Sequence, residues 1–138
     1  MCGINGFTFS DPGALRRMHA ATSHRGPDDQ GFFEVDGVSL AHNRLSIIDL
    51  SPGGHQPMST KDGRYTIVFN GEIYNYRELK SDLEAIGEVF HSSSDTEVLL
   101  ALFARHGEAC LPMLNGIFAF GIWDRDEQRL TIARDHLG

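Results

Sequence analysis

The chain has 138 residues, of which 41% are hydrophobic and 22% are charged, proportions that are ordinary for one globular domain with a single core. Twelve Lys and Arg residues against nineteen Asp and Glu residues give a formal net charge of -7, which opposes attraction to phosphate, so we expect no nucleic-acid partner. No apolar stretch approaches the ~20 residues that span a bilayer and the amino terminus lacks a signal-peptide pattern, so we expect a cytoplasmic protein without membrane contact.

Turn and strand signals predict a strand, a helix and three further strands in the first half of the chain. Residues 2–9 are apolar and β-prone, and Asp11 and Pro12 stand in positions that begin a helix. Apolar runs predict the further strands, at 32–35, 38–46 and 65–71. The segment 49–60 is rich in Gly, Pro and Ser, so we predict a loop there.

Two helices and a hairpin are predicted in the second half. Apolar residues at helical spacing predict a helix over 76–86, and polar caps followed by an apolar body predict another over 95–106. The apolar runs 116–124 and 129–135, separated by a charged turn, predict a closing hairpin. The sum is an α+β protein in which helices pack over sheets in layers.

Cys2 stands directly behind the initiator methionine, where removal of Met1 would leave it with both its thiol and a free α-amine. A free α-amine titrates at roughly pH 7.7–8.0, so it can accept the thiol proton, and nucleophile and base then share one residue. The other interpretation is a small buried side chain in an edge strand. Cys110 lies in the apolar run ACLPML and is predicted to pack in the core. Cysteine and histidine spacings match no metal motif, so we expect no metal site.

Asn70 and Gly71 end the predicted strand 65–71. The side-chain amide of Asn70 and the backbone N–H of Gly71 would suit an oxyanion hole, and an ordinary Asn-Gly turn is the alternative. Arg44 lies among apolar residues, so its guanidinium requires an anion. That anion is either a substrate carboxylate or an internal acid such as Asp49.

Glu72 and Asp95 are carboxylates that would hold an ammonium group. The alternatives are a solvated surface charge for Glu72 and a helix cap for Asp95. Together, a thiol, a guanidinium, an amide donor and a pair of carboxylates match the groups of a free α-amino acid that carries a side-chain amide.

Several motifs occur in an order typical of one family: CGI at 2–4, HRGPD at 24–28, RLSIIDLS at 44–51, NGEIYN at 70–75 and SDTE at 94–97. With these motifs the chain resembles the glutamine amidotransferase domain of glutamine-dependent asparagine synthetases, a class II amidotransferase and N-terminal nucleophile hydrolase. The closing segments 116–124 and 133–138 are similar to that family as well. The resemblance implies a four-layer αββα sandwich over residues 1–138.

The resemblance also implies a mechanism. Cys2, after loss of Met1, would attack the side-chain amide of glutamine, release ammonia and leave a glutamyl thioester that water hydrolyses. The side chain of Asn70 and the N–H of Gly71 would stabilise the tetrahedral intermediate. The HRGPD segment would support the site structurally and stay out of the chemistry.

Substrate contacts follow from the same resemblance. Arg44 would bind the carboxylate of glutamine, and Glu72 and Asp95 would bind its α-amine. Backbone groups of Leu45 and Ile47 would add further contacts.

The family continues past the position of Gly138 into a synthetase domain, so we expect the sandwich to be truncated at its C-terminal end. No phosphate-binding loop of the SGGxDS type occurs, so ATP and Mg²⁺ are expected only in the missing domain and no cofactor in this chain. The synthetase domain would receive the ammonia. A homodimer is a further possible assembly that the sequence does not decide. The alternatives are the glutaminase domain of a polysaccharide-biosynthesis amidotransferase and a non-catalytic binding module of the same fold.

Overall fold

The computed structural model describes residues 1–137 and contains two antiparallel sheets that face each other. The first sheet has the order β1-β3-β2, built from Gly3–Phe7 (β1), Asp29–Val35 (β2) and Val38–Arg44 (β3). The second has the order β4-β5-β6-β7, built from Met58–Ser59 (β4), Tyr65–Ile73 (β5), Gly116–Asp124 (β6) and Arg129–Arg134 (β7).

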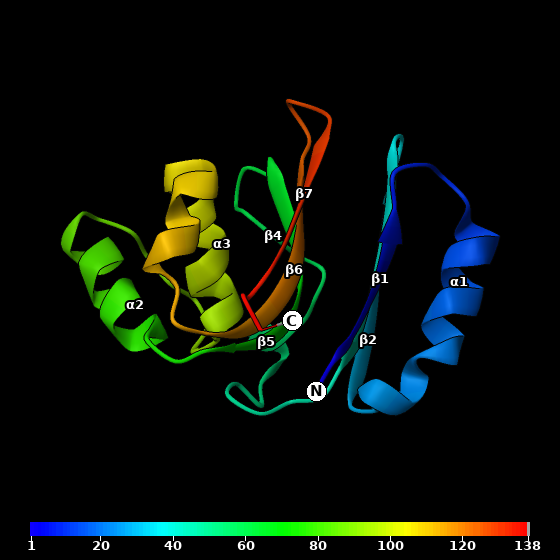
Figure 1. Ribbon diagram of the computed structural model, residues 1–138, viewed down its shortest axis with the longest axis horizontal. Coiled ribbons are helices and arrows are strands. Elements are labelled where there is room, and N and C mark those ends of the chain that lie inside the picture. Colours follow the sequence, from blue (N-terminus) through cyan, green and yellow to red (C-terminus); the bar gives the residue numbers. More distant parts are fainter. Residues whose placement is uncertain (138) are drawn as a thin grey trace.

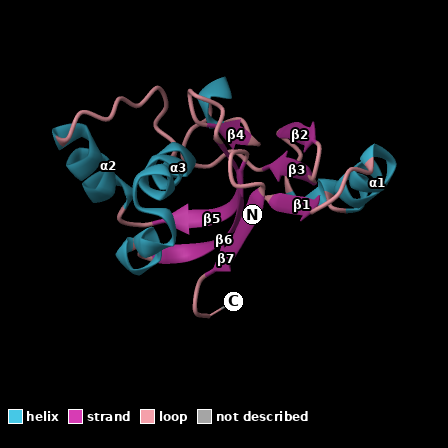
Figure 2. Cartoon of the chain, turned by 90° about the horizontal axis from the view of Figure 1, so that it is seen from above, coloured by secondary structure: helices cyan, strands magenta, loops and turns pink. Residues whose placement is uncertain are grey.

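Helices cover the outer face of each sheet (Figure 1). Helix α1 (Pro12–Ala21) lies against the first sheet, and helices α2 (Tyr76–Ala85) and α3 (Asp95–His106) lie against the second. The view from above in Figure 2 shows the same succession of helix, sheet, sheet and helices. The four-layer αββα sandwich implied by the resemblance is therefore confirmed.

Helices α1 and α3 begin at the caps that the sequence indicated. Asp11 caps α1, because its side chain accepts a hydrogen bond of 2.8 Å from the N–H of Ala14. Ser94 caps α3 by accepting from the N–H of Thr96, and the residue after the last residue of α3 is Gly107, whose φ of 56° suits glycine.

Two local predictions were wrong. Met58–Ser59, inside the predicted loop 49–60, forms the short strand β4, because it pairs with β5 at Ile67 and Thr66. Strand β5 does not stop at Gly71 but continues to Ile73, because its pairing with β6 continues to that residue.

The larger core lies between the second sheet and its helices, and the smaller core lies between the two sheets. Cys110 is fully buried in the larger core, and burial raises the pKa of its thiol to about 11, which confirms its packing role. Val38, Leu40, Val68 and Trp123 form the smaller core.

Alternation along the strands decides which side chains face the gap between the sheets. Leu40 in β3 lies in the inter-sheet core and Asn43 donates to the carbonyl of His19 in α1, so residue 44 again faces the gap. Ile4 in β1 packs in the same core, which places residue 2 on the same face. Val68 in β5 also packs in this core, so residue 70, two positions further along the strand, faces the gap from the opposite sheet.

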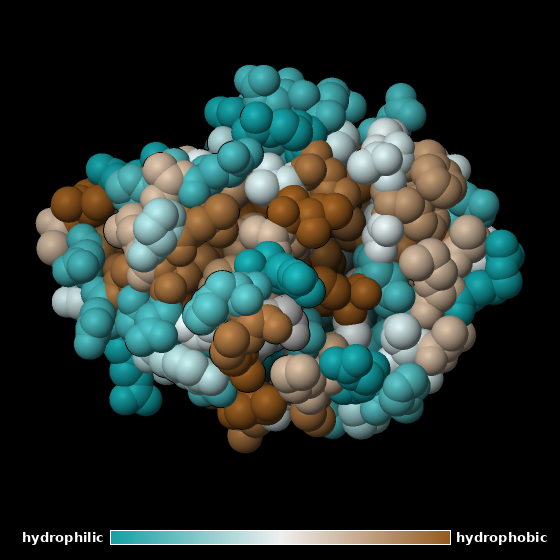
Figure 3. All heavy atoms as spheres, in the orientation of Figure 1, coloured by the Kyte–Doolittle hydropathy of each residue, from teal (hydrophilic) through white to brown (hydrophobic). Residues whose placement is uncertain are grey.

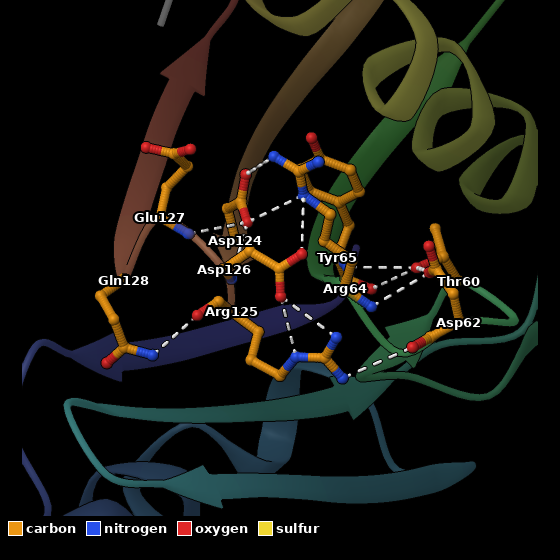
Figure 4. A network of polar contacts seen from close by, with 9 residues as sticks. All are labelled: Thr60, Asp62, Arg64, Tyr65, Asp124, Arg125, Asp126, Glu127 and Gln128. Carbon is orange, nitrogen blue, oxygen red and sulfur yellow. Dashed lines mark hydrogen bonds and ion pairs between the residues drawn. The ribbon is translucent and has the colours of Figure 1, made fainter.

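A polar network holds together the end of the second sheet at which β5 begins and β6 ends (Figure 4). Arg64 donates to both carboxylate oxygens of Asp124, at 3.1 and 2.9 Å, and Asp124 also accepts from the backbone of Asp126 and Glu127. These bonds lower the pKa of Asp124, with the bond from Arg64 as the largest cause.

None of the helices within residues 1–137 has the length and apolar character needed to cross a membrane.

Candidate active site

A cavity of about 100 Å³ opens between the two sheets. Every residue that the sequence analysis named as catalytic or substrate-binding lines it: Cys2, Arg44, Leu45, Ile47, Asn70, Gly71, Glu72 and Asp95. In the space-filling view, hydrophobic residues gather along the middle of the visible face (Figure 3). The exposed side chains of Ile47 and Ile117 are part of the cavity wall.

The sulfur of Cys2 lies against the backbone of Leu45, directly after β3. The N–H of Leu45 donates to Sγ at 3.3 Å, and the thiol donates to the carbonyl of Leu45 at 3.6 Å. Cys2 is partly exposed, so its thiol is held in place yet remains accessible from the cavity. Met1 lines the same cavity and is 58% exposed.

The guanidinium of Arg44 is buried and held by backbone carbonyls. Nη1 donates to the carbonyl of Ser51 at 3.0 Å and Nη2 donates to the carbonyl of Asp49. A Cβ built on Gly54 would overlap Nη2, so glycine at this position leaves the room that the guanidinium fills. Because a guanidinium has five N–H groups, donors remain for a ligand in the cavity.

The carboxylate of Asp49 bonds backbone N–H groups rather than the guanidinium of Arg44. It accepts from the N–H of Ser51 at 2.8 Å and of Ser93 at 3.0 Å, and hydrogen bonding from Ser51 is the main reason that its pKa is lowered to about 2. The carboxylate nearest to Arg44 that forms an ion pair is Asp29, at 4.0 Å. Asp49 is therefore wrong as the internal acid that pairs with Arg44, and the acid at ion-pair distance from the guanidinium is Asp29.

The segment that contains HRGPD supports the end of β3. The N–H of Asp28 donates to the carbonyl of Arg44 at 3.0 Å, and its carboxylate accepts from the N–H of Ser46 at 2.8 Å. Both bonds fix the backbone on either side of Leu45, which holds the sulfur of Cys2.

Asn70 and Gly71 lie inside β5, opposite Ala119 and Phe118 of β6, so the alternative of an Asn-Gly turn is wrong. A Cβ on Gly71 would overlap the carbonyl of Ile117 and come within 2.6 Å of Cα of Phe118, so the close approach of β6 requires glycine. The side-chain oxygen of Asn70 is buried and has no hydrogen-bond partner among the described residues.

The register shows where the N–H of Gly71 points. The N–H and C=O of Phe118 bond to Asp135, each at 2.9 Å, on the side of β6 away from β5. Gly71 and Phe118 are therefore a non-hydrogen-bonded pair, and the backbone groups of Gly71 point away from β6. They point to the edge of the sheet at which the cavity lies.

Asp95 is 5% exposed at the first position of α3. It accepts a hydrogen bond of 3.0 Å from the N–H of Ile73. Burial raises its pKa, and the negative charge of the exposed Glu72 adds to the shift. A buried carboxylate beside a second carboxylate is a local environment that favours a bound cation.

Several residues around the cavity were not named from the sequence. Gln56 and Thr96 line it, and Gln56 donates to Thr96 at 3.2 Å. His42 lies behind it, fully buried, with Nε2 at 3.0 Å from the carbonyl of Phe69. The alternation in β3 placed His42 on the same face as Arg44, whereas Gln56, in a loop, gave no local signal.

Comparison with known proteins matches this arrangement to one family. The family model described as "Glutamine amidotransferase domain" matches residues 1–138. Asparagine synthetase [glutamine-hydrolyzing] 1 of Bacillus subtilis is 44% identical over the whole chain, and Amidase chry2 of Gibberella zeae is also 44% identical; the chain spans 23% of the length of each. The solved structure of glutamine phosphoribosylpyrophosphate amidotransferase from B. subtilis matches 74% of this chain and 24% of its own, with a TM-score of 0.58 and 30% identity. The chain belongs to the glutamine amidotransferase domain family.

Proposed function

We propose that this domain hydrolyses glutamine to glutamate and ammonia through a thioester on Cys2. The observation that carries the proposal is the convergence of a thiol, a guanidinium, an amide and a pair of carboxylates on one cavity between the sheets. The family and the names of its glutamine-hydrolysing relatives support the same reaction.

Removal of Met1 supplies the base in this proposal. While Met1 is attached, the nitrogen of Cys2 is an amide and has no basic lone pair. The freed α-amine takes the thiol proton, directly or through a water, and the sulfur attacks the side-chain carbonyl carbon of glutamine. The N–H of Leu45, which points at the sulfur, favours negative charge there.

The opposite sheet provides the oxyanion hole. The side-chain N–H of Asn70 and the backbone N–H of Gly71 donate to the oxygen of the tetrahedral intermediate. The α-ammonium returns its proton to the nitrogen as the C–N bond breaks, and ammonia leaves. Water then attacks the thioester while the α-amine takes its proton, the C–S bond breaks, the sulfur receives the proton, and glutamate is released.

The amino-acid end of glutamine is bound at the two charged ends of the cavity. The remaining N–H groups of Arg44 hold the α-carboxylate, with Leu45 and Ile47 adding contacts. Asp95 and Glu72 hold the α-ammonium, because a bound cation compensates both the burial that raises the pKa of Asp95 and the smaller repulsion from Glu72.

The ammonia is passed to an amide-forming synthetase domain of the asparagine-synthetase type. Two asparagine synthetases of Bacillus subtilis are 44% and 42% identical, and this chain spans 23% and 24% of their lengths. Any ATP and Mg²⁺ belong to that domain in this proposal, since no residue of the cavity is assigned to them.

Release of glutamate from glutamine, measured for the wild-type chain and for Cys2→Ala, tests the proposal. The wild type should turn over and Cys2→Ala should not. Asp124→Asn, which changes a buried side chain at the other end of the sheet, is the control for general damage. A folded wild type without turnover would favour the non-catalytic binding module, and equal rates with and without the Cys2 thiol would exclude the thioester.

A further inference from the structure

Among residues 1–137, the edge of β5 next to the cavity has no strand partner along most of its length. Strand β4 covers this edge only at Thr66 and Ile67. Beyond them, by alternation, the residues whose N–H and C=O groups point to the edge are Phe69, Gly71 and Ile73. A buried backbone group needs a hydrogen-bond partner, so the partners of these residues decide how β5 is held.

Side chains replace the missing strand on one side of Gly71. The amide oxygen of Gln56 accepts from the N–H of Phe69 at 2.7 Å, and Nε2 of His42 lies 3.0 Å from the carbonyl of Phe69. Gln56 and His42 are 5% and 0% exposed, so water does not compete for these bonds. Both edge-facing groups of Phe69 are therefore fixed by side chains.

The first turn of α3 holds the strand on both sides of Gly71. Gln56 uses its amide nitrogen to donate to Thr96 at 3.2 Å, which links α3 to Phe69. The neighbouring Asp95 accepts from the N–H of Ile73 at 3.0 Å. With Phe69 and Ile73 occupied, the N–H of Gly71 is left facing the cavity between two anchored positions.

We propose that Gln56 and His42 are positioning residues. Their bonds to the N–H and C=O of Phe69, here called the two caps, fix the direction of the Asn70 amide and the Gly71 N–H in the oxyanion hole. The inference rests on the proposed function, because the task that it assigns to both residues is to hold the strand that carries the oxyanion hole. Both polar ends of the Gln56 side chain are already bonded within the protein.

The chemistry of His42 fits this task. Its contact with a carbonyl requires Nε2 to carry the proton, and Nδ1 has no partner among the described residues. Burial lowers its pKa to about 4, so at neutral pH the ring is uncharged and Nε2–H is its single donor. The same buried ring spans the gap between β3, which precedes the Cys2 contact at Leu45, and β5.

The test compares Gln56→Met and His42→Leu, which remove the two caps, with Thr66→Val in the full chain. Thr66 is 1% exposed on the same strand and its hydroxyl bonds that of Ser59, so Thr66→Val removes a partly buried hydrogen bond away from the site. His42→Gln retains an amide donor for the Phe69 carbonyl. The kcat and KM for glutamine, the melting temperature, and the NMR position of the Gly71 amide are measured for each variant.

We expect Gln56→Met and His42→Leu to lower kcat by at least about 10-fold with KM within about twofold, because displacement of catalytic groups by ~1 Å slows reactions by ~10²-fold. The Gly71 amide signal should move in both. Thr66→Val should lower the melting temperature alone, and His42→Gln should recover most of the kcat lost in His42→Leu.

The inference is overturned if the Gly71 signal stays in place in the cap variants, whether or not the chain turns over glutamine. It is also overturned if kcat falls equally in Thr66→Val, since the effect would then be one of stability. A wild type that does not hydrolyse glutamine refutes the proposed function and leaves the Gly71 signal to decide whether the caps position β5. Should a cap variant fail to fold, Gln56→Glu, which keeps the acceptor for Phe69, is compared with Thr96→Val.

Discussion

Gly54→Ala tests the substrate role of Arg44 without removing the arginine. A Cβ on Gly54 would lie 2.8 Å from Cζ of Arg44, whereas carbon atoms in contact lie about 3.5–4.0 Å apart. The guanidinium must therefore move by about 1 Å. A shift of this size in a bound charged pair should lower kcat/KM for glutamine by about 10²-fold, chiefly through KM, because the contact exists in the ground state and the transition state alike.

The assay is steady-state glutamate release with glutamine and with its analogue in which the α-carboxylate is an amide. The wild type should strongly prefer glutamine, and Gly54→Ala should lose most of that preference. Gly121→Ala is the matched control, because a Cβ there would lie 3.6 Å from Leu130 and Val68, an ordinary contact. A folded Gly54→Ala with wild-type KM and preference would refute the assignment of the carboxylate to Arg44.

Three further predictions concern the oxyanion hole, the ammonium site and the fold. Asn70→Ala should lower kcat by about 10²-fold or more with KM little changed, and unaltered kinetics would remove Asn70 from the chemistry. Because the pKa of Asp95 is raised by burial, kcat/KM should fall on acidification at a higher pH than an ordinary aspartate would give, and Asp95→Asn should abolish this limb of the profile while raising KM. Because the pKa of Asp124 is lowered in the fold, its bonds with Arg64 stabilise the protein above the unfolded pKa of about 3.9 and are lost as pH falls through the folded value. Asp124→Asn should therefore reduce the melting temperature at pH ~7 and have little effect near pH ~2, whereas an equal loss at both would show a packing effect.

Helices and pairing strands were predictable from the sequence because their signals are local. The cap at Ser94, the apolar body of α3 and the glycine at 107 all act within a few residues of one another. The apolar neighbours of Arg44 likewise indicated that its side chain would be buried, although its hydrogen-bond partners proved to be carbonyls of the following loop.

The parts that could not be predicted depend on distant pairing. Asn70 and Gly71 have the composition of a turn, but nine residues of β6 pair with β5 and keep the strand extended. Gln56 lies between His55 and Pro57 in a loop, and nothing near it indicates that its amide bonds a strand residue 13 positions away. Both cases are long-range hydrogen bonds that outweigh local preference.

The central claim is that Cys2 acts as an N-terminal nucleophile, and the most direct measurement compares the chain with and without Met1. Both forms are incubated with a glutamine analogue that carries an electrophilic diazoketone in place of the side-chain amide, and intact mass is followed over time. We predict a single adduct on Cys2 in the processed form, glutamate release by that form alone, and neither adduct nor turnover while Met1 is attached. Equally fast labelling and hydrolysis by the chain that retains Met1 would contradict the α-amine mechanism.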